Sequence, residues 1–152
     1  MGYISVIGSG SWGTTLAALL SSKGYDVTLW SHEKETADNI NEKQLNPVYL
    51  PDRPLPAELK ATTDIYSAVS KSRYIVNVVP TQHIRTVFGS IAHAIKDDSL
   101  IISASKGIEI KTLQTPSMIL KEVLKKDAAV ISGPSFAMEV SAKMPTAVTL
   151  AA

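Results

Sequence analysis

Apolar and polar positions form segments of two kinds along this chain. Short, nearly continuous apolar runs are typical of strands buried on both faces of a parallel sheet, and longer segments with apolar residues three and four apart are typical of helices. The pattern predicts strands at residues 3–7, 26–30, 59–62, 74–79, 99–103, 128–131 and 147–150. It predicts helices at residues 12–23, 35–42, 65–69, 82–94, 115–124 and 136–142. This alternation indicates a doubly wound, mostly parallel α/β sheet with helices on both faces.

One long connection interrupts the alternation. Residues 46–56 contain four prolines and are expected to be irregular, and a connection of this length favours a functional loop. The sequence has no internal repeat, low-complexity tract or linker, so we expect residues 1–152 to form a single domain. Because the chain stops in an apolar strand, we also expect this domain to come from a longer polypeptide.

A glycine motif follows the first predicted strand. Residues 8–13 read GSGSWG and lead directly into the first predicted helix. In this context the spacing is the dinucleotide-binding fingerprint: Gly8 allows the tight turn, Gly10 lets the backbone approach a pyrophosphate, and Gly13 lets the helix pack closely. The pyrophosphate would accept hydrogen bonds from unpaired amides at the start of the helix. The sequence therefore predicts a Rossmann-type fold that binds a dinucleotide.

The residue after the second predicted strand bears on cofactor choice. A strict NAD enzyme would place an acidic residue there, but this chain has Ser31 and His32. With Lys34, these side chains suit the 2′-phosphate of NADP, whereas Glu33 suits the ribose diol of NAD. A solvated turn is the alternative interpretation, so both NAD and NADP remain open.

Two further strand ends carry candidate substrate groups. Lys106 follows the fifth predicted strand, where its ammonium group would hydrogen-bond a carbonyl oxygen or a substrate phosphate. Gly133 shapes the turn after the next strand, and Ser135 offers a hydroxyl to an anion at the start of a helix. The alternatives are a solvated surface lysine and a capped helix start.

Composition narrows the class of partner. The 152 residues include 15 basic and 14 acidic side chains, for a net charge of +1, without runs of like charge, so a small-molecule partner is expected and a nucleic acid is not. The absence of cysteine excludes disulfides and thiolate metal sites, and His83 and His93 lack ligand spacing, so we expect no metal. Apolar runs are too short for membrane insertion and no secretory signal is evident, which favours a cytoplasmic location.

Five motifs in order resemble one enzyme family across essentially the whole chain. They are GSGSWGT (8–14), LWSH (29–32), NPVYLP (46–51), SKGIE (105–109) and SGPSFA (132–137). Together they are similar to bacterial-type NAD(P)-dependent glycerol-3-phosphate dehydrogenase. The resemblance implies reversible hydride transfer between NAD(P)H and dihydroxyacetone phosphate, giving sn-glycerol 3-phosphate for glycerophospholipid synthesis.

The same resemblance implies roles for individual residues. Lys106 would face both cofactor and substrate, and Gly133 and Ser135 would help to hold the substrate. The chain departs from the family at Asp52, where members often have glycine. Side chains that would line the cofactor are those of Ser11, Trp12, His32, Tyr49 and Ala137.

Family members continue into a helical C-terminal domain that supplies a second lysine as the main general acid/base, and full-length members commonly form homodimers. We therefore expect this chain to bind the cofactor and, alone, to be inactive or nearly so. Two alternatives remain: a non-catalytic NAD(P)-sensing module, and a related dehydrogenase acting on a β-hydroxy acid or an imine.

Overall fold

The computed structural model describes residues 2–152 and confirms the alternation of strands and helices. The strands are β1 (Ile4–Ile7), β2 (Val27–Trp30), β3 (Lys60–Thr62), β4 (Tyr74–Asn77), β5 (Leu100–Ser103), β6 (Ala128–Ser132) and β7 (Thr149–Ala151). The helices are α1 (Ser11–Ser22), α2 (Lys34–Lys43), α3 (Ile65–Ser70), α4 (Thr81–Ile91), the 3₁₀ turn η1 (Ala92–Ala94), α5 (Pro116–Leu124) and α6 (Ala137–Ser141).

The seven strands form one sheet in the order β3-β2-β1-β4-β5-β6-β7, as in a doubly wound Rossmann-type fold. All neighbours are parallel except β7, which runs antiparallel to β6. The strand order reverses between β1 and β4, and ligands of such sheets bind beyond the carboxyl ends of the strands at that point. The predicted fold class is therefore confirmed, and the antiparallel edge strand is the one feature that the apolar pattern left unspecified.

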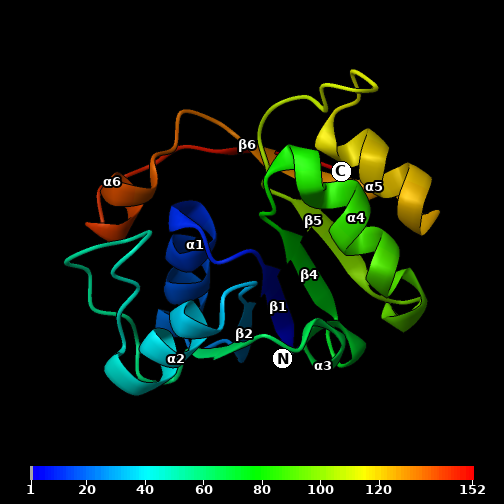
Figure 1. Ribbon diagram of the computed structural model, residues 1–152. Coiled ribbons are helices and arrows are strands. Elements are labelled where there is room, and N and C mark those ends of the chain that lie inside the picture. The colour runs from blue at the N-terminus through cyan, green and yellow to red at the C-terminus, as the bar shows by residue number, and fades with distance from the viewer. Residues whose placement is uncertain (1) are drawn as a thin grey trace.

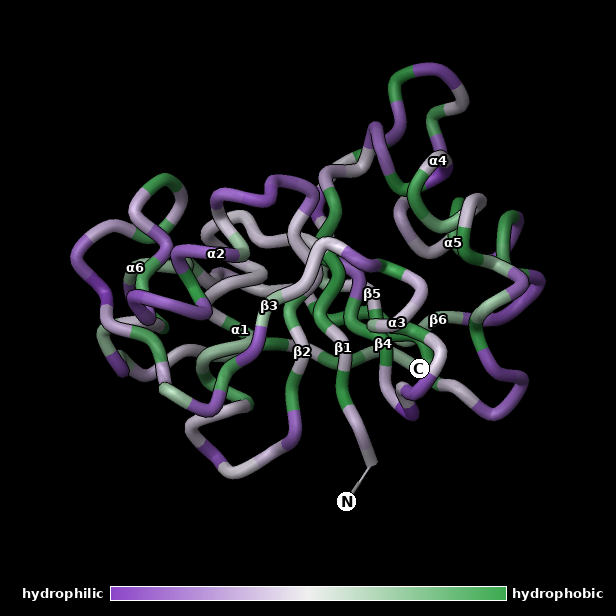
Figure 2. The backbone as a smooth tube through the Cα atoms, turned by 60° about the horizontal axis from the view of Figure 1, so that its bottom comes forward, coloured by the Kyte–Doolittle hydropathy of each residue, from purple (hydrophilic) through white to green (hydrophobic). Residues whose placement is uncertain are grey.

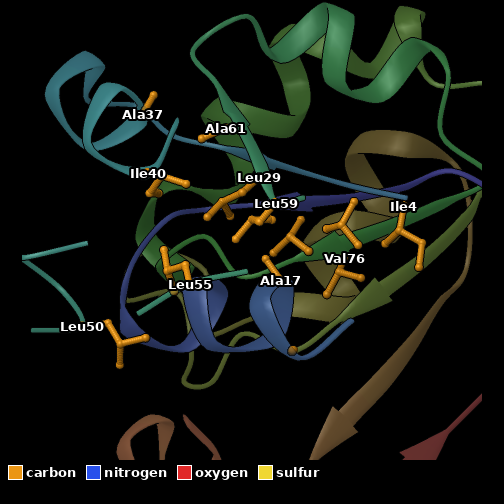
Figure 3. Close-up of a cluster of buried hydrophobic side chains, with 13 residues drawn as sticks. Ile4, Ala17, Leu29, Ala37, Ile40, Leu50, Leu55, Leu59, Ala61 and Val76 are labelled. Carbon is orange, nitrogen blue, oxygen red and sulfur yellow. The ribbon is translucent and has the colours of Figure 1, made fainter. Parts of the chain in front are cut away.

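Helices cover both faces of the sheet (Figure 1). One face packs against α1 and α2, with α6 beside α1, and its core includes Ile4, Leu29 and Val76 from three strands together with Ala17 of α1 (Figure 3). The other face packs against α3, α4 and α5 around a second cluster that includes Phe88. The central strands are consequently mostly apolar, whereas the loops around them are mostly polar (Figure 2).

The proline-rich stretch is irregular, as predicted, but it is packed onto the domain. A single bridge joins Asn46 to Leu50, and the side chains of Leu50 and Leu55 are buried in the first core cluster. Asp52 has a φ of 59°, in the left-handed region that favours glycine and that aspartate tolerates better than most residues.

The turn between β1 and α1 brings two glycines into contact. Gly8 has a φ of 118°, and a methyl group added there would lie 2.9 Å from the carbonyl oxygen of Val78. A methyl group added at Gly13 would lie only 1.9 Å from the carbonyl oxygen of Gly8. Helix α1 can therefore start directly over the end of β1 only because residue 13 has no side chain.

We predict that Gly13→Ala lowers the free energy of unfolding by more than about 2 kcal/mol, because backbone atoms must move to admit the methyl group. Gly10→Ala is the matched control, since a methyl group there would meet no atom within 4 Å. As Gly10 caps α1, this control should lose no more than about 1 kcal/mol. Urea unfolding of both variants measures the difference, and equal losses would contradict the contact.

Candidate functional site

The start of α1 lies at the carboxyl end of β1, next to the reversal of strand order. The amide of Thr14 donates to the carbonyl of Gly10 (2.9 Å), so the amides of residues 11–13 precede the hydrogen-bonded ladder of the helix. Beside them, Gly10 borders open space, since no atom lies within 4 Å of a methyl group added there. Free amides at the positive end of a helix, next to open space, fit the pyrophosphate of a dinucleotide.

A buried asparagine holds this glycine turn to the proline-rich loop. Asn46 donates from Nδ2 to the carbonyl of Ser9 (2.9 Å) and to Oγ1 of Thr14 (2.8 Å). Its Oδ1 accepts a hydrogen bond from the amide of Tyr49 (3.2 Å). Asn46 therefore fixes the loop that carries Tyr49 against the turn that precedes α1.

At the end of β2, two hydrogen bonds hold the side chain of Ser31 in place. Ser31 is fully buried, and its Oγ accepts a hydrogen bond from Ser9 (2.8 Å) and donates to the carbonyl of Glu33 (2.9 Å). Because its only hydrogen is donated to Glu33 and the side chain is shielded from solvent, this hydroxyl has no donor left for a phosphate. Ser31 thus joins the glycine turn to the start of α2, and its contact with the cofactor stays a prediction.

The neighbouring side chains remain exposed. His32 is exposed, and the Tyr49 hydroxyl donates to Oε1 of Glu33 (2.9 Å), a bond that raises the pKa of Tyr49. Lys34 pairs with Asp38 (2.5 Å) one turn along α2 rather than with Glu33. The structure therefore brings the predicted residues His32 and Tyr49 to one edge of the sheet, next to the glycine turn.

On the other side of this turn, a cavity of about 390 Å³ opens beyond the ends of β4 and β5. Loops from three strand ends and the start of α1 surround it. The lining residues are Ser11, Trp12, Val78, Val79, Pro80, Ala104, Ser105, Lys106, Ser135, Phe136 and Ala137. Five residues predicted from the sequence, Ser11, Trp12, Lys106, Ser135 and Ala137, are thus brought together in one cavity.

Lys106 spans the cavity. Its Nζ donates to the carbonyl oxygens of Gly133 (3.1 Å) and Ser135 (3.3 Å) and lies 5.9 Å from the centre of the Trp12 ring. An ammonium group at this distance is attracted by the face of an indole. The charge of Lys106 is therefore held between the start of α1 and the loop that follows β6.

The loop after β6 is held by close backbone contacts. A methyl group added at Gly133 would lie 2.7 Å from the carbonyl oxygen of Ala147, so glycine is needed where these two segments meet. The amide of Ser135 donates to the carbonyl of Gly133 (2.9 Å), and α6 has only five residues. The Ser135 hydroxyl, 3.5 Å from Nζ of Lys106, is consequently the polar side-chain group that this loop directs toward Lys106.

Residues 105–114, which we call the lysine loop, are bound to α4. Thr81 donates from Oγ1 to the carbonyl of Lys106 (2.8 Å). Gln82 donates to the carbonyl of Ile108 (2.8 Å) and accepts from the amide of Ile110 (3.0 Å). The loop that carries Lys106 therefore follows the first turn of α4 rather than projecting freely from its start.

An ion-pair cluster holds the far part of the same loop. Arg85 on α4 contacts both carboxylate oxygens of Glu109 (3.2 and 3.1 Å), Oε1 of Gln114 (2.9 Å) and Oε1 of Glu122 (2.8 Å). Hydrogen bonds from Arg85 and then Thr112 lower the pKa of Glu109, and Arg85 likewise lowers the pKa of Glu122. The Glu109 carboxylate is thus held charged although its side chain is almost fully buried.

Sequence reasoning identified Lys106 but missed the side chains that hold its loop. Arg85 and Glu109 are 24 positions apart, in a predicted helix and a predicted loop, and no local pattern pairs them. The available signal was a single carboxylate between Ile108 and Ile110, because an acidic residue in an apolar stretch requires a partner if it is buried. For Asn46, too, no local pattern indicates its contacts with Ser9 and Thr14.

The described residues, 2–152, contain neither a cluster of metal-binding side chains nor a membrane-spanning helix. No three His, Asp or Glu side chains in this range lie close enough to hold a metal ion. No helix in the described part of the chain is long and apolar enough to cross a membrane.

Strand order, glycine turn and flanking cavity define a Rossmann-type dinucleotide-binding domain. Comparison with known proteins is more specific: residues 3–152 match the family model described as NAD-dependent glycerol-3-phosphate dehydrogenase N-terminus. The chain belongs to this family.

Individual proteins of this family are also similar to the chain. The chain is 44% identical to glycerol-3-phosphate dehydrogenase [NAD(P)+] of Citrifermentans bemidjiense, over 98% of this chain and 46% of the relative. The crystal structure of glycerol-3-phosphate dehydrogenase from Coxiella burnetii superposes with a TM-score of 0.91 at 37% identity, covering 98% of this chain and 46% of the other. The structure of the Saccharomyces cerevisiae enzyme superposes with a TM-score of 0.89 at 30% identity and with the same coverage of both chains. The chain thus spans about half the length of these relatives.

We predict that Glu109→Gln removes a pH-dependent contribution to stability. The pKa of Glu109 in the folded chain is lower than its ordinary value of 4.5, so its ionised form stabilises the fold above that value and the contribution is lost as pH falls through the lowered pKa. The difference in free energy of unfolding between the wild type and Glu109→Gln should be largest above about pH 6 and shrink toward about pH 3. Urea unfolding across this pH range measures it, and a constant difference would contradict the ion pair.

Proposed function

We propose that this chain is the cofactor-binding half of a glycerol-3-phosphate dehydrogenase that interconverts dihydroxyacetone phosphate and sn-glycerol 3-phosphate with NADH or NADPH. The observation that carries the proposal is the juxtaposition of the free amides of α1 with the cavity that Lys106 spans. The names of its relatives support the reaction, and the glycine turn supports the cofactor. We extend the proposal to a cytoplasmic enzyme that forms a homodimer when full length.

The cofactor-binding residues divide along the sheet edge. The amides of Ser11 and Trp12 would hold the pyrophosphate at the start of α1. His32 and Tyr49, on the β2 side, would contact the adenosine end. Ala137, on the cavity side, would line the nicotinamide end. When bound there, the nicotinamide supplies or accepts the hydride.

Cofactor preference depends on the β2 side. The carboxylate of Glu33, held by Tyr49, suits the ribose diol of NAD, whereas the exposed imidazole of His32 suits the 2′-phosphate of NADP. Lys34 is paired with Asp38 and would have to leave that partner to bind a phosphate. Both nucleotides therefore remain part of the proposal.

On the substrate side, Lys106 would exchange its backbone partners for substrate oxygens. Its ammonium group donates to the carbonyls of Gly133 and Ser135, which are weaker acceptors than a phosphate or a developing alkoxide. The Ser135 hydroxyl lies close enough to contribute a second donor. The second lysine expected to act as the main general acid/base belongs to the C-terminal half of the family and not to residues 1–152.

The first test is a titration of the 152-residue chain with NADH and with NADPH, followed by fluorescence of Trp12 and Trp30, beside an assay of turnover with dihydroxyacetone phosphate. We expect saturable binding with little or no turnover, because the group needed for proton transfer is supplied elsewhere. The tighter nucleotide would show which interpretation of His32 and Glu33 is correct.

Gly10→Ala is the matched variant for this test, since its methyl group enters the open space beside the amides while the fold tolerates it. It should weaken binding by about tenfold or more, the effect of losing one close backbone contact to a phosphate. Absence of saturable binding by the folded wild type, or equal binding by Gly10→Ala, would overturn the proposal. Turnover by the chain alone at rates normal for an enzyme would overturn the assignment of the acid/base group to the other half.

A further inference from the structure

We infer that Arg85, acting through Glu109, is a positioning residue for Lys106. This inference is based on the contacts of the lysine loop. Only the expected effect on cofactor and substrate binding rests on the proposed function. Figure 1 shows this loop projecting beyond the ends of α4 and α5. If the loop made no contacts there, the position of Lys106 would not be fixed. The structure instead ties it down at successive points along α4.

The attachment begins close to Lys106 itself. Thr81 and Gln82, in the first turn of α4, bind the backbone at Lys106, Ile108 and Ile110. These three hydrogen bonds, of 2.8, 2.8 and 3.0 Å, come from two consecutive residues and fix the direction in which the chain leaves β5. Gly107, with a φ of 108°, makes the sharp change of direction between them.

Arg85 lies one turn further along α4 and holds the part of the loop that Thr81 and Gln82 do not reach. The side chain of Glu109 is only 7% exposed, whereas that of Arg85 is 33% exposed. A carboxylate this deeply buried is stable only when it is paired and hydrogen-bonded. Both requirements are met, because the Arg85 fork contacts both carboxylate oxygens and Thr112 donates a further bond.

The backbone around Glu109 closes the turn that this pair supports. The amide of Glu109 donates to the carbonyl of Gln114 (2.9 Å), and the amide of Leu113 donates to the carbonyl of Glu109 (2.8 Å). Arg85 also contacts the side chains of Gln114 and Glu122, and so connects the turn to α5. Loss of Arg85 would therefore release a folded turn, with an uncompensated buried charge, three residues from Lys106.

The consequence concerns the place of the Lys106 ammonium group. Its contacts to Gly133 and Ser135, at 3.1 and 3.3 Å, hold only while the loop backbone stays within reach of the segment after β6. Lys106 is already exposed, so a loop that separates from α4 does not uncover this amine but frees it from its two carbonyl acceptors and removes it from the cavity. Arg85 thus acts on the site without touching it.

The experiment measures the Lys106 amine directly. Competitive labelling with an amine-reactive reagent gives the rate at Lys106 relative to Lys23, an exposed lysine at the end of α1. Variants Arg85→Gln and Glu109→Gln should raise this ratio by about tenfold, the factor that corresponds to one charge-assisted hydrogen bond. Arg85→Lys keeps the charge but loses the fork, so it should give an intermediate ratio.

The matched control is Arg73→Gln, which removes the exposed Arg73–Asp98 ion pair away from the lysine loop and should leave the ratio unchanged. Labelling is done where circular dichroism shows each variant to be folded. If Arg85→Gln does not fold, Gln82→Ala removes two loop contacts without removing a charge, and should raise the ratio in the same direction.

The same samples are titrated with NADH to separate the two proposals. We expect Arg85→Gln to weaken NADH binding while Arg73→Gln does not. A labelling ratio for the folded loop variants equal to that of Arg73→Gln would overturn the positioning role. The expected labelling ratios together with no NADH binding by the wild type would instead uphold the positioning of Lys106 and overturn the proposed function.

Discussion

The close approach of Gly13 to the carbonyl oxygen of Gly8 is the constraint on which the rest of the site depends. With 1.9 Å between that oxygen and the place of a Cβ at residue 13, only glycine allows α1 to begin directly over the end of β1. This position points the unbonded amides of the helix across the reversal of strand order. A helix displaced by one side chain would direct its positive end elsewhere and would break the hydrogen bonds between the turn and Asn46.

From this turn the structure extends in two directions. On the β2 side, Asn46 fastens the proline-rich loop, so that Tyr49 meets Glu33 beside His32. On the β4 side, α4 fastens the lysine loop, so that Lys106 reaches across the cavity to the segment after β6. In both cases a buried polar side chain, Asn46 or Glu109, fixes the conformation of a long irregular segment. Apolar packing alone would fix it less well, because a buried polar group must keep its hydrogen-bond partners.

The sequence predicts features that depend on neighbouring residues, and the structure adds the contacts between segments that are distant in the sequence. Strands, helices and the glycine turn follow from periodicity and spacing, and Lys106 follows from its place after a buried strand. The place of Ser31 after a strand predicts a cofactor contact, whereas its hydrogen bonds to Ser9 and to the backbone of Glu33 follow only from the fold. The Arg85–Glu109 pair and the antiparallel direction of β7 depend on tertiary contacts between distant segments, which no local pattern encodes.

The central claim is that the amides at the start of α1 hold the pyrophosphate of a nicotinamide dinucleotide. Amide ¹H–¹⁵N spectra of the chain during titration with NADH test it most directly. The account predicts saturating shifts at residues 9–13, with further shifts at His32, Tyr49 and Lys106. Unchanged amides at residues 9–13, or shifts confined to the separate apolar cavity between α1 and the sheet, around Leu16 and Ile102, would contradict it.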